Sequence, residues 1–250
     1  MIWGLTISYK EKMTKLKPFG SRLISLLLAL AMIAALIPVI SVTAAASNNA
    51  YIMLRENEPR YGCEAPWNAP WYWDGQTLNL YGSYSYSFNL GGDDSAYYFE
   101  IESSNDKFYP TVLVSNSISV DLGSSGTFVY SEKDLTVKGA GMIKATGTGT
   151  LFSAPDSTID YNGGAILSDE AVTVFSADTI SYIKGQVIAP KGIFSSEYFW
   201  MTDGYIDLDS ITAVDSNVSV TVYRGFLDLQ TLMPGKAGTA STYDYRDCVI

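Results

Sequence analysis

The chain has 250 residues, of which 16 are Lys or Arg, 26 are Asp or Glu and none is His, so its formal net charge is −10. The absence of histidine excludes a Ser-His-Asp triad and any histidine metal ligand, and Cys63 and Cys248 are too far apart in sequence for a zinc site. Hydrophobic residues make up 47% of the chain and aromatic residues 13%, which is enough for a folded core and excludes disorder of the whole chain.

Residues 1–46 have the pattern of a secretory signal peptide. Basic residues precede an apolar run over 23–42, and small residues with Ala-x-Ala spacing follow it. An uncleaved membrane anchor is the alternative, because about twenty apolar residues can span a bilayer. Pro38 and the cleavage-site spacing favour removal. We therefore expect a secreted or bacterial cell-surface protein that has no stable membrane span after cleavage.

Export has two consequences for the mature chain. Without residues 1–46 the chain keeps 11 basic and 25 acidic residues, a net charge of −14, which repels nucleic acid and anionic lipid. We expect no nucleic-acid partner. In an oxidising compartment Cys63 and Cys248 can form a disulfide that ties both ends of the mature chain to its body; two unpaired thiols are the alternative.

Residues 47–117 are rich in aromatic residues. Within a short stretch that contains two prolines stand Trp67, Trp71, Tyr72 and Trp73. Exposed rings of this kind stack on the apolar faces of sugars, so these four are candidate carbohydrate-binding residues. The alternative is that the rings close the N-terminal end of the fold, which their position just before the first regular strands favours. These strands, as first coils or as an irregular β cap, are expected at 77–81, 85–90, 96–102 and 111–114.

Residues 118–230 repeat with a period of about 21 residues. Glycines recur at intervals of 19 to 23 residues, at Gly141, Gly164, Gly185, Gly204 and Gly225. Two residues after each glycine stands an aliphatic residue, in the order Ile143, Ile166, Val187, Ile206 and Leu227. A second apolar position recurs as Leu135, Ile159, Ile180, Phe199 and Val220. These positions mark the inward side of strands whose side chains alternate with period two.

A third register consists of an aromatic residue followed by serine. It gives Phe152-Ser153, Phe175-Ser176 and Phe194-Ser195, with Tyr130-Ser131 before them and a degenerate Val214-Asp215 after. Three short strands per repeat, each too brief to stand alone, predict an all-β fold: a single-stranded parallel β-helix, or solenoid, with coils of 19–23 residues. The glycines would form its corners, and residues 231–250 would form a C-terminal loop or tail.

The repeats also carry a resemblance. Segments written Thr158-Ile159-x-Tyr161-x-Gly163-Gly164-x-Ile166-x-Ser168 and Val172-x-Val174-Phe175-Ser176 resemble right-handed parallel β-helix repeats of bacterial secreted and cell-surface proteins. Some modules of that group are labelled carbohydrate-binding. The resemblance covers about 118–230, and it implies a β-helix that associates with polysaccharide or with cell-surface glycan.

Three carboxylates are candidate metal ligands. Asp207 and Asp209 alternate with inward apolar residues, and Asp228 is expected one coil away, beside Asp207. Three carboxylates on one outer face could bind Ca²⁺ or act as an acid/base pair; a solvated sheet face is the alternative. No other cofactor is expected, and no catalytic residue is assigned.

These features favour a secreted, non-catalytic cell-surface β-helix protein that binds glycan or polysaccharide. Two alternatives stay open. One is a structural or adhesive surface protein that pairs with other proteins or with itself, since stacked strands with imperfect caps can associate end to end. The other is a calcium-dependent polysaccharide lyase that uses Asp207, Asp209 and Asp228.

Overall fold

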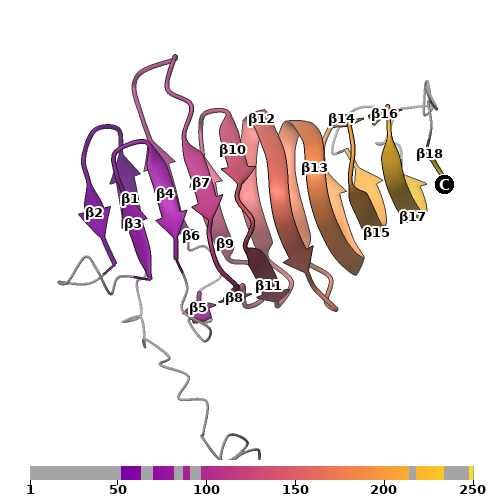
Figure 1. Cartoon of the computed structure of the whole chain (residues 1–250), viewed down its shortest axis with the longest axis horizontal. Coiled ribbons are helices and arrows are strands. Elements are labelled where there is room, and N and C mark those ends of the chain that lie inside the picture. Colours follow the sequence, from indigo (N-terminus) through magenta and orange to yellow (C-terminus); the bar gives the residue numbers. More distant parts are fainter. Residues whose placement is uncertain are drawn as a thin grey trace, which may run out of the picture. The chain divides into compact units, whose positions relative to one another are not determined.

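The structure is a computed structural model, and it describes residues 52–62, 70–81, 87–90, 97–213, 218–233 and 248–249. The regular elements in these ranges are the strands β1 to β18 (Figure 1). The described residues include no helix long and apolar enough to span a membrane.

The strands stack in three parallel ladders, and the chain visits each ladder in turn. The first ladder begins with β1 (Ile52–Arg55), β6 (Tyr97–Glu102), β9 (Thr127–Ser131), the first part of β12 (Thr150–Leu167) and the first part of β13 (Thr173–Ser195). The strand β13 runs through a whole coil, so its end returns to this ladder. The ladder then continues with the end of β15 (Tyr205–Thr212) and the end of β17 (Gly225–Met233).

The other two ladders follow the same order along the chain. The second contains β4 (Thr77–Leu80), β7 (Thr111–Val114), β10 (Leu135–Lys138), the middle parts of β12 and β13, β14 (Tyr198–Met201) and β16 (Ser219–Val222). The third contains β5 (Ser87–Asn89), β8 (Ile118–Asp121), β11 (Met142–Thr146), the later parts of β12 and β13, the starts of β15 and β17, and β18 (Cys248–Val249). This is the predicted parallel β-solenoid.

Two of the predicted apolar columns are confirmed in register. In the third ladder Ile143 pairs with Ile166, and the column continues in order through Val187, Ile206 and Leu227. In the second ladder Leu135 pairs with Ile159, and the column continues through Ile180, Phe199 and Val220. All ten side chains are buried. Such columns form because each coil lays the same inward position directly on the one before it.

The aromatic register predicted for the first ladder is wrong at both of its ends. Phe152 pairs with Val129 rather than with Tyr130, and Phe194 pairs with Ile211 rather than with Val214, which lies outside the described residues. Val129 is fully buried, whereas the ring of Tyr130 belongs to the half-buried outer side. The buried valine, and not the adjacent tyrosine, therefore occupies the inward position of this ladder.

Parallel stacking begins upstream of the predicted start at residue 118. The strands β4, β5 and β6 already lie on β7, β8 and β9, so they form early coils. The strands β2 (Arg60–Tyr61) and β3 (Trp71–Trp73) add antiparallel to β4 and form the cap. At the other end β17 continues to Met233 and β18 pairs with its start, so part of the expected C-terminal tail is strand.

Candidate functional site

Trp71 and Trp73, two of the predicted carbohydrate-binding residues, lie inside the fold. Trp73 is fully buried, packs edge-on against Phe108 at 6.3 Å between ring centroids, and donates a 2.8 Å hydrogen bond from Nε1 to the carbonyl of Arg55. Trp71 is 5% exposed and packs edge-on against Phe99 at 5.1 Å. Neither ring face is open to a sugar, and both rings close the N-terminal end, as the cap interpretation predicts. Trp67 lies outside the described residues.

Tyr72 lies on the opposite side of β3 and reaches the surface. Its ring stacks on the ring of Tyr61, with 4.6 Å between centroids and 19° between planes. Tyr61 is 46% exposed and Tyr72 is half-buried. Desolvation, followed by the hydrogen bond and charge of Tyr61, raises the pKa of Tyr72, so its hydroxyl is neutral at physiological pH. We call these two residues the cap tyrosine pair.

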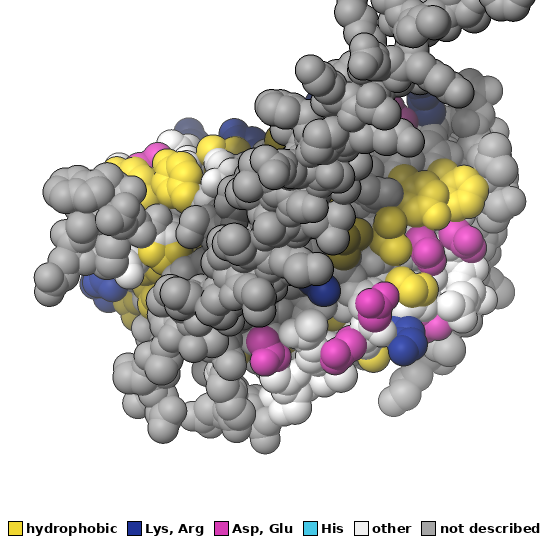
Figure 2. Space-filling model, turned by 60° about the horizontal axis from the view of Figure 1, so that its bottom comes forward, with side chains coloured by type: hydrophobic (Ala, Val, Ile, Leu, Met, Phe, Trp, Pro, Cys, Tyr) yellow, Lys and Arg dark blue, Asp and Glu magenta, His cyan; other side chains and the backbone are white. Residues whose placement is uncertain are grey.

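The three candidate metal ligands do not form a metal site. Asp207 and Asp228 are neighbours in register, as expected. Asp209, two residues along the strand, is about 7 Å further on, and its Oδ2 accepts a 3.2 Å hydrogen bond from Ser210 Oγ. Nowhere in the described residues do three Asp, Glu or Cys side chains lie together so that they could hold a metal ion. Figure 2 shows acidic side chains interspersed with hydrophobic, basic and uncharged ones.

Of the two cysteines of the predicted disulfide, only one lies within the described residues. Cys63 lies outside the described residues, and Cys248 is described only as a member of β18. Because β18 pairs with the start of β17, the backbone of Cys248 lies at the last described strand of the third ladder. The pairing of the two cysteines stays a prediction.

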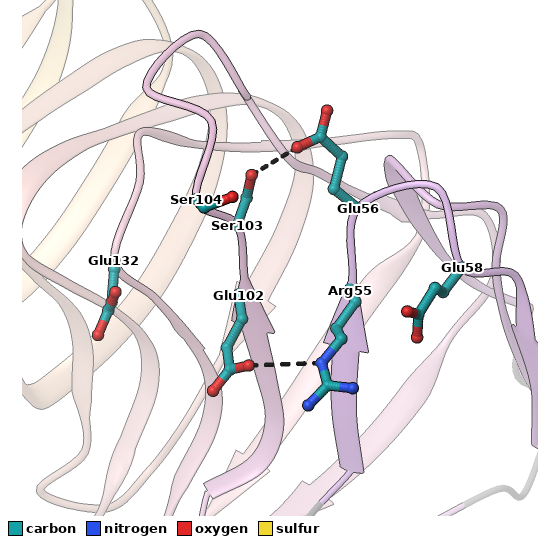
Figure 3. A pocket seen from close by; sticks show the side chains of 7 residues that line it. All are labelled: Arg55, Glu56, Glu58, Glu102, Ser103, Ser104 and Glu132. Carbon is teal, nitrogen blue, oxygen red and sulfur yellow. Dashed lines mark hydrogen bonds and ion pairs between the residues drawn. The ribbon is translucent and has the colours of Figure 1, made fainter.

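An acidic hollow of about 450 Å³ opens beside the first coils (Figure 3). Its lining comes from the ends of β1, β6 and β9 and consists of Arg55, Glu56, Glu58, Glu102, Ser103, Ser104 and Glu132. Ser103 Oγ donates a 2.6 Å hydrogen bond to Glu56 Oε2, and Asn105 Nδ2 donates one of 3.1 Å to Oε1. Arg55 Nε lies 3.6 Å from Glu102 Oε2.

The electrostatics of Glu56 do not suit acid catalysis. The hydrogen bond from Ser103, and then that from Asn105, lower the pKa of Glu56, so this carboxyl group is ionised at neutral pH. A catalytic acid needs the opposite, a pKa raised towards neutrality. The hollow also presents no aromatic face for a sugar ring. It was not evident from the sequence because its residues come from three separate coils.

The aromatic side chains that do face outward in the second ladder lie on β14. Tyr198 is 46% exposed and Trp200 is 50% exposed, whereas Phe199 and Met201 between and beyond them are fully buried. Four hydroxyl side chains flank these rings in register: Thr179 and Ser181 on β13, and Ser219 and Thr221 on β16. We call these six residues the Trp200 platform.

The platform combines apolar ring faces with hydroxyl groups and carries no charge. Two residues along one strand place the rings of Tyr198 and Trp200 about 7 Å apart on the same side. Such a surface can cover an apolar ring face and offer hydrogen bonds around its edge. Sequence reasoning missed it, although a signal was present. Phe199 belongs to a predicted inward column, so alternation places both of its neighbours outward.

Comparisons with protein-family models, with curated proteins and with solved structures found no match to this chain.

Proposed function

We propose that this protein is a secreted, non-catalytic β-solenoid that binds glycan at the cell surface, through the Trp200 platform. The observation that carries the proposal is the exposure of half the Trp200 side chain on a sheet face whose in-register neighbours are all Ser or Thr. Burial of a tryptophan usually stabilises a fold. A tryptophan that is half exposed beside an exposed tyrosine therefore favours a surface whose apolar area is buried when a ligand binds.

The chemistry of the platform supports a sugar. A pyranose ring has an apolar face and a rim of hydroxyl groups, and the platform offers an indole plane, a phenol and four aliphatic hydroxyls. The rigid sheet holds these groups in place before binding, which limits the entropy lost on association. The predicted export signal and the resemblance of the repeats to carbohydrate-binding β-helix modules support the same function.

The test is binding of the purified protein to a panel of polysaccharides. The panel contains insoluble cellulose and chitin, assayed by pull-down, and soluble xylan, mixed-linkage glucan and polygalacturonate, assayed by affinity electrophoresis. We expect retention by at least one uncharged member. Trp200→Ala should weaken it by about 30-fold, since an interface tryptophan contributes on the order of 2 kcal/mol. Trp200→Phe, which keeps an aromatic face, should lose much less.

A matched control is Tyr205→Ala, because Tyr205 is also an exposed aromatic residue but lies on the third ladder, stacked on Phe226. It should bind like the wild type. Unchanged retention of Trp200→Ala would overturn the proposal. So would concentration-dependent light scattering that Trp200→Ala abolishes without any sugar, because the platform would then dock a second copy of the chain.

A further inference from the structure

The Trp200 platform and the cap tyrosine pair belong to one continuous sheet. The strands β2, β3 and β4 pair antiparallel in that order, and from β4 the second ladder continues in parallel to β14 and β16. In Figure 1 this sheet can be followed from β2 at the left to β16 at the right. The two aromatic clusters therefore lie near opposite ends of one sheet face.

Both clusters point to the outer side of this sheet. Tyr72 alternates with the buried Trp71 and Trp73, as Trp200 alternates with Phe199 and Met201. Two adjacent rows on the outer side connect the clusters, and all their members except Asn79, which is only 8% exposed, are at least partly exposed. The first row consists of Thr77, Thr111, Thr136, Asp160, Ser181, Trp200 and Thr221. The second row consists of Tyr61, Tyr72, Asn79, Leu113, Lys138, Asn162 and Lys184. We call the two rows the outer lane.

The outer lane carries no stretch of a single charge. Asp160 is the one charged member of the first row, and it lies on the strand next to Lys138 of the second row. Most other members are hydroxyl, amide or aromatic side chains. An acidic polymer would find only two cations here, Lys138 and Lys184, with Asp160 against them, and would meet the negative field of the whole protein. The lane is therefore suited to an uncharged chain.

The geometry also favours a ligand that runs along the solenoid axis. A chain lying across the sheet, along β14, would meet Tyr198 and Trp200 and then the corner at Gly204. Along the axis, by contrast, the same outward positions recur with each strand, about 4.8 Å apart. Six strand steps separate β3 from β14, so the two aromatic clusters lie about 29 Å apart along this direction.

We infer that the ligand is a linear, uncharged polysaccharide that lies along the outer lane and contacts the Trp200 platform at one end and the cap tyrosine pair at the other. This inference rests on the proposed function and specifies its ligand. Two weak contacts on one rigid scaffold act together when one chain spans both, because the second contact becomes intramolecular. Affinity should therefore depend on ligand length, with a step near 29 Å.

The experiment uses oligosaccharides of graded length cut from the polysaccharide that the panel retains, for example the cello-oligosaccharide series if it is cellulose. Isothermal titration gives the Kd for the wild type, Tyr61→Ala, Trp200→Ala and the control Tyr205→Ala. We expect oligosaccharides longer than about 29 Å to bind at least tenfold more tightly than shorter ones. Tyr61→Ala should remove most of that gain and leave short ligands unaffected, whereas Trp200→Ala should weaken both.

Hydrogen exchange gives a second readout that needs no substitution in the cap. A long oligosaccharide should slow exchange in both β3–β4 and β14–β16, and a short one in β14–β16 alone. The inference is overturned if long ligands bind no more tightly than short ones, if Tyr61→Ala binds them like the wild type, or if polygalacturonate binds equally well. In these cases Trp200→Ala still tests the proposed function separately, because that function is overturned if the variant binds every probe normally, whatever the length dependence.

Discussion

Tyr161 and Tyr182 place two phenol groups inside a core that is otherwise almost entirely apolar. They pair in register on β12 and β13, with ring centroids 5.1 Å apart. The hydroxyl of Tyr182 donates a 3.1 Å hydrogen bond to the carbonyl of Tyr205. Desolvation raises the pKa of both phenols, and for Tyr182 the neighbouring Tyr161 adds to the effect. The folded protein therefore keeps both groups protonated well above pH 10.

This burial predicts a loss of stability in alkali. In the unfolded chain both phenols ionise near pH 10, so above that pH the unfolded state binds fewer protons than the folded state. The stabilisation is fully present below about pH 10, and the free energy of unfolding then falls by up to about 1.4 kcal/mol per pH unit for each group. Guanidinium unfolding at several values between pH 8 and pH 12 measures the slope.

The matched variant is the double substitution Tyr161→Phe with Tyr182→Phe, which keeps both rings and removes both titrations. It should flatten the decline above pH 10. At neutral pH it should cost about 0.5–1.5 kcal/mol, for the lost hydrogen bond to Tyr205. An alkaline slope as steep as that of the wild type would show that other groups cause the decline.

Single residues also explain why the candidate site was only partly predictable. The density of tryptophan near residue 70 drew attention to Trp71 and Trp73, but density does not tell on which side of a strand a ring lies. The structure buries both and leaves Tyr72 between them at the surface. For Trp200 the side of the strand on which the ring lies was predictable, because Trp200 directly follows Phe199 and Phe199 belongs to a confirmed inward column. Spacing within a repeat is thus more informative than composition.

At the scale of strands, the repeat made most of the fold predictable. The strands expected at 77–81, 85–90, 96–102 and 111–114 occur as β4, β5, β6 and β7, with ends shifted by no more than two residues. The exception is the register of β9, whose adjacent buried residues Phe128 and Val129 correspond to Leu151-Phe152 of β12 and Val174-Phe175 of β13. Matching by residue type aligns Tyr130-Ser131 with Phe152-Ser153, whereas the burial pattern aligns Val129 with Phe152, so a prediction from aromatic residues is off by one here. The strand β18 has only two residues, too few for any pattern to indicate.

The aromatic column of the first ladder supplies a test at this scale. The ring centroid of Phe175 lies 5.9 Å from Phe152, 5.0 Å from Phe194 and 5.3 Å from Tyr161, and its side chain is fully buried. Phe175→Ala should lower the free energy of unfolding by about 3–5 kcal/mol, because the coils above and below limit how far the cavity can collapse. Chemical denaturation followed by tryptophan fluorescence measures the loss.

Phe175→Leu should cost less than half as much, since it keeps most of the apolar volume. Ser176→Ala is the control, because Ser176 is the next residue of β13 and alternates to the outer side; it should stay within about 0.5 kcal/mol of the wild type. Equal losses for Phe175→Ala and Ser176→Ala would show that the column is not the principal source of stability in this ladder.

At the scale of the described solenoid, each coil rests mainly on the coils before and after it. Stability in such a stack is close to a sum of coil terms and neighbour terms, so a defect acts locally. Corners reinforce this dependence on neighbours. At Gly204 the backbone has φ +109°, and an added Cβ would lie 2.7 Å from the carbonyl oxygen of Gly185 one coil below. The coils are thus held closer at this corner than any side chain would permit.

Local dependence predicts that the two ends of the stack can be loosened separately. Trp73→Ala removes a fully buried ring and its hydrogen bond to the Arg55 carbonyl at the N-terminal end. It should raise amide exchange in β1, β4 and β6 and leave β14–β16 unchanged. Phe199→Ala, which empties a buried position on β14, should do the reverse. Native-state hydrogen exchange resolved by peptide measures both.

The outcome bears on the outer lane as well as on folding. If Trp73→Ala raises exchange equally in all strands, the stack unfolds as one cooperative unit and the additive description is wrong. If exchange rises only near the cap, the same variant should weaken long oligosaccharides by disturbing Tyr72, which lies next to Trp73 on β3, and should leave short ones bound at the intact β14. A variant that is destabilised only at the cap thus tests the two contacts of a spanning glycan independently of each other.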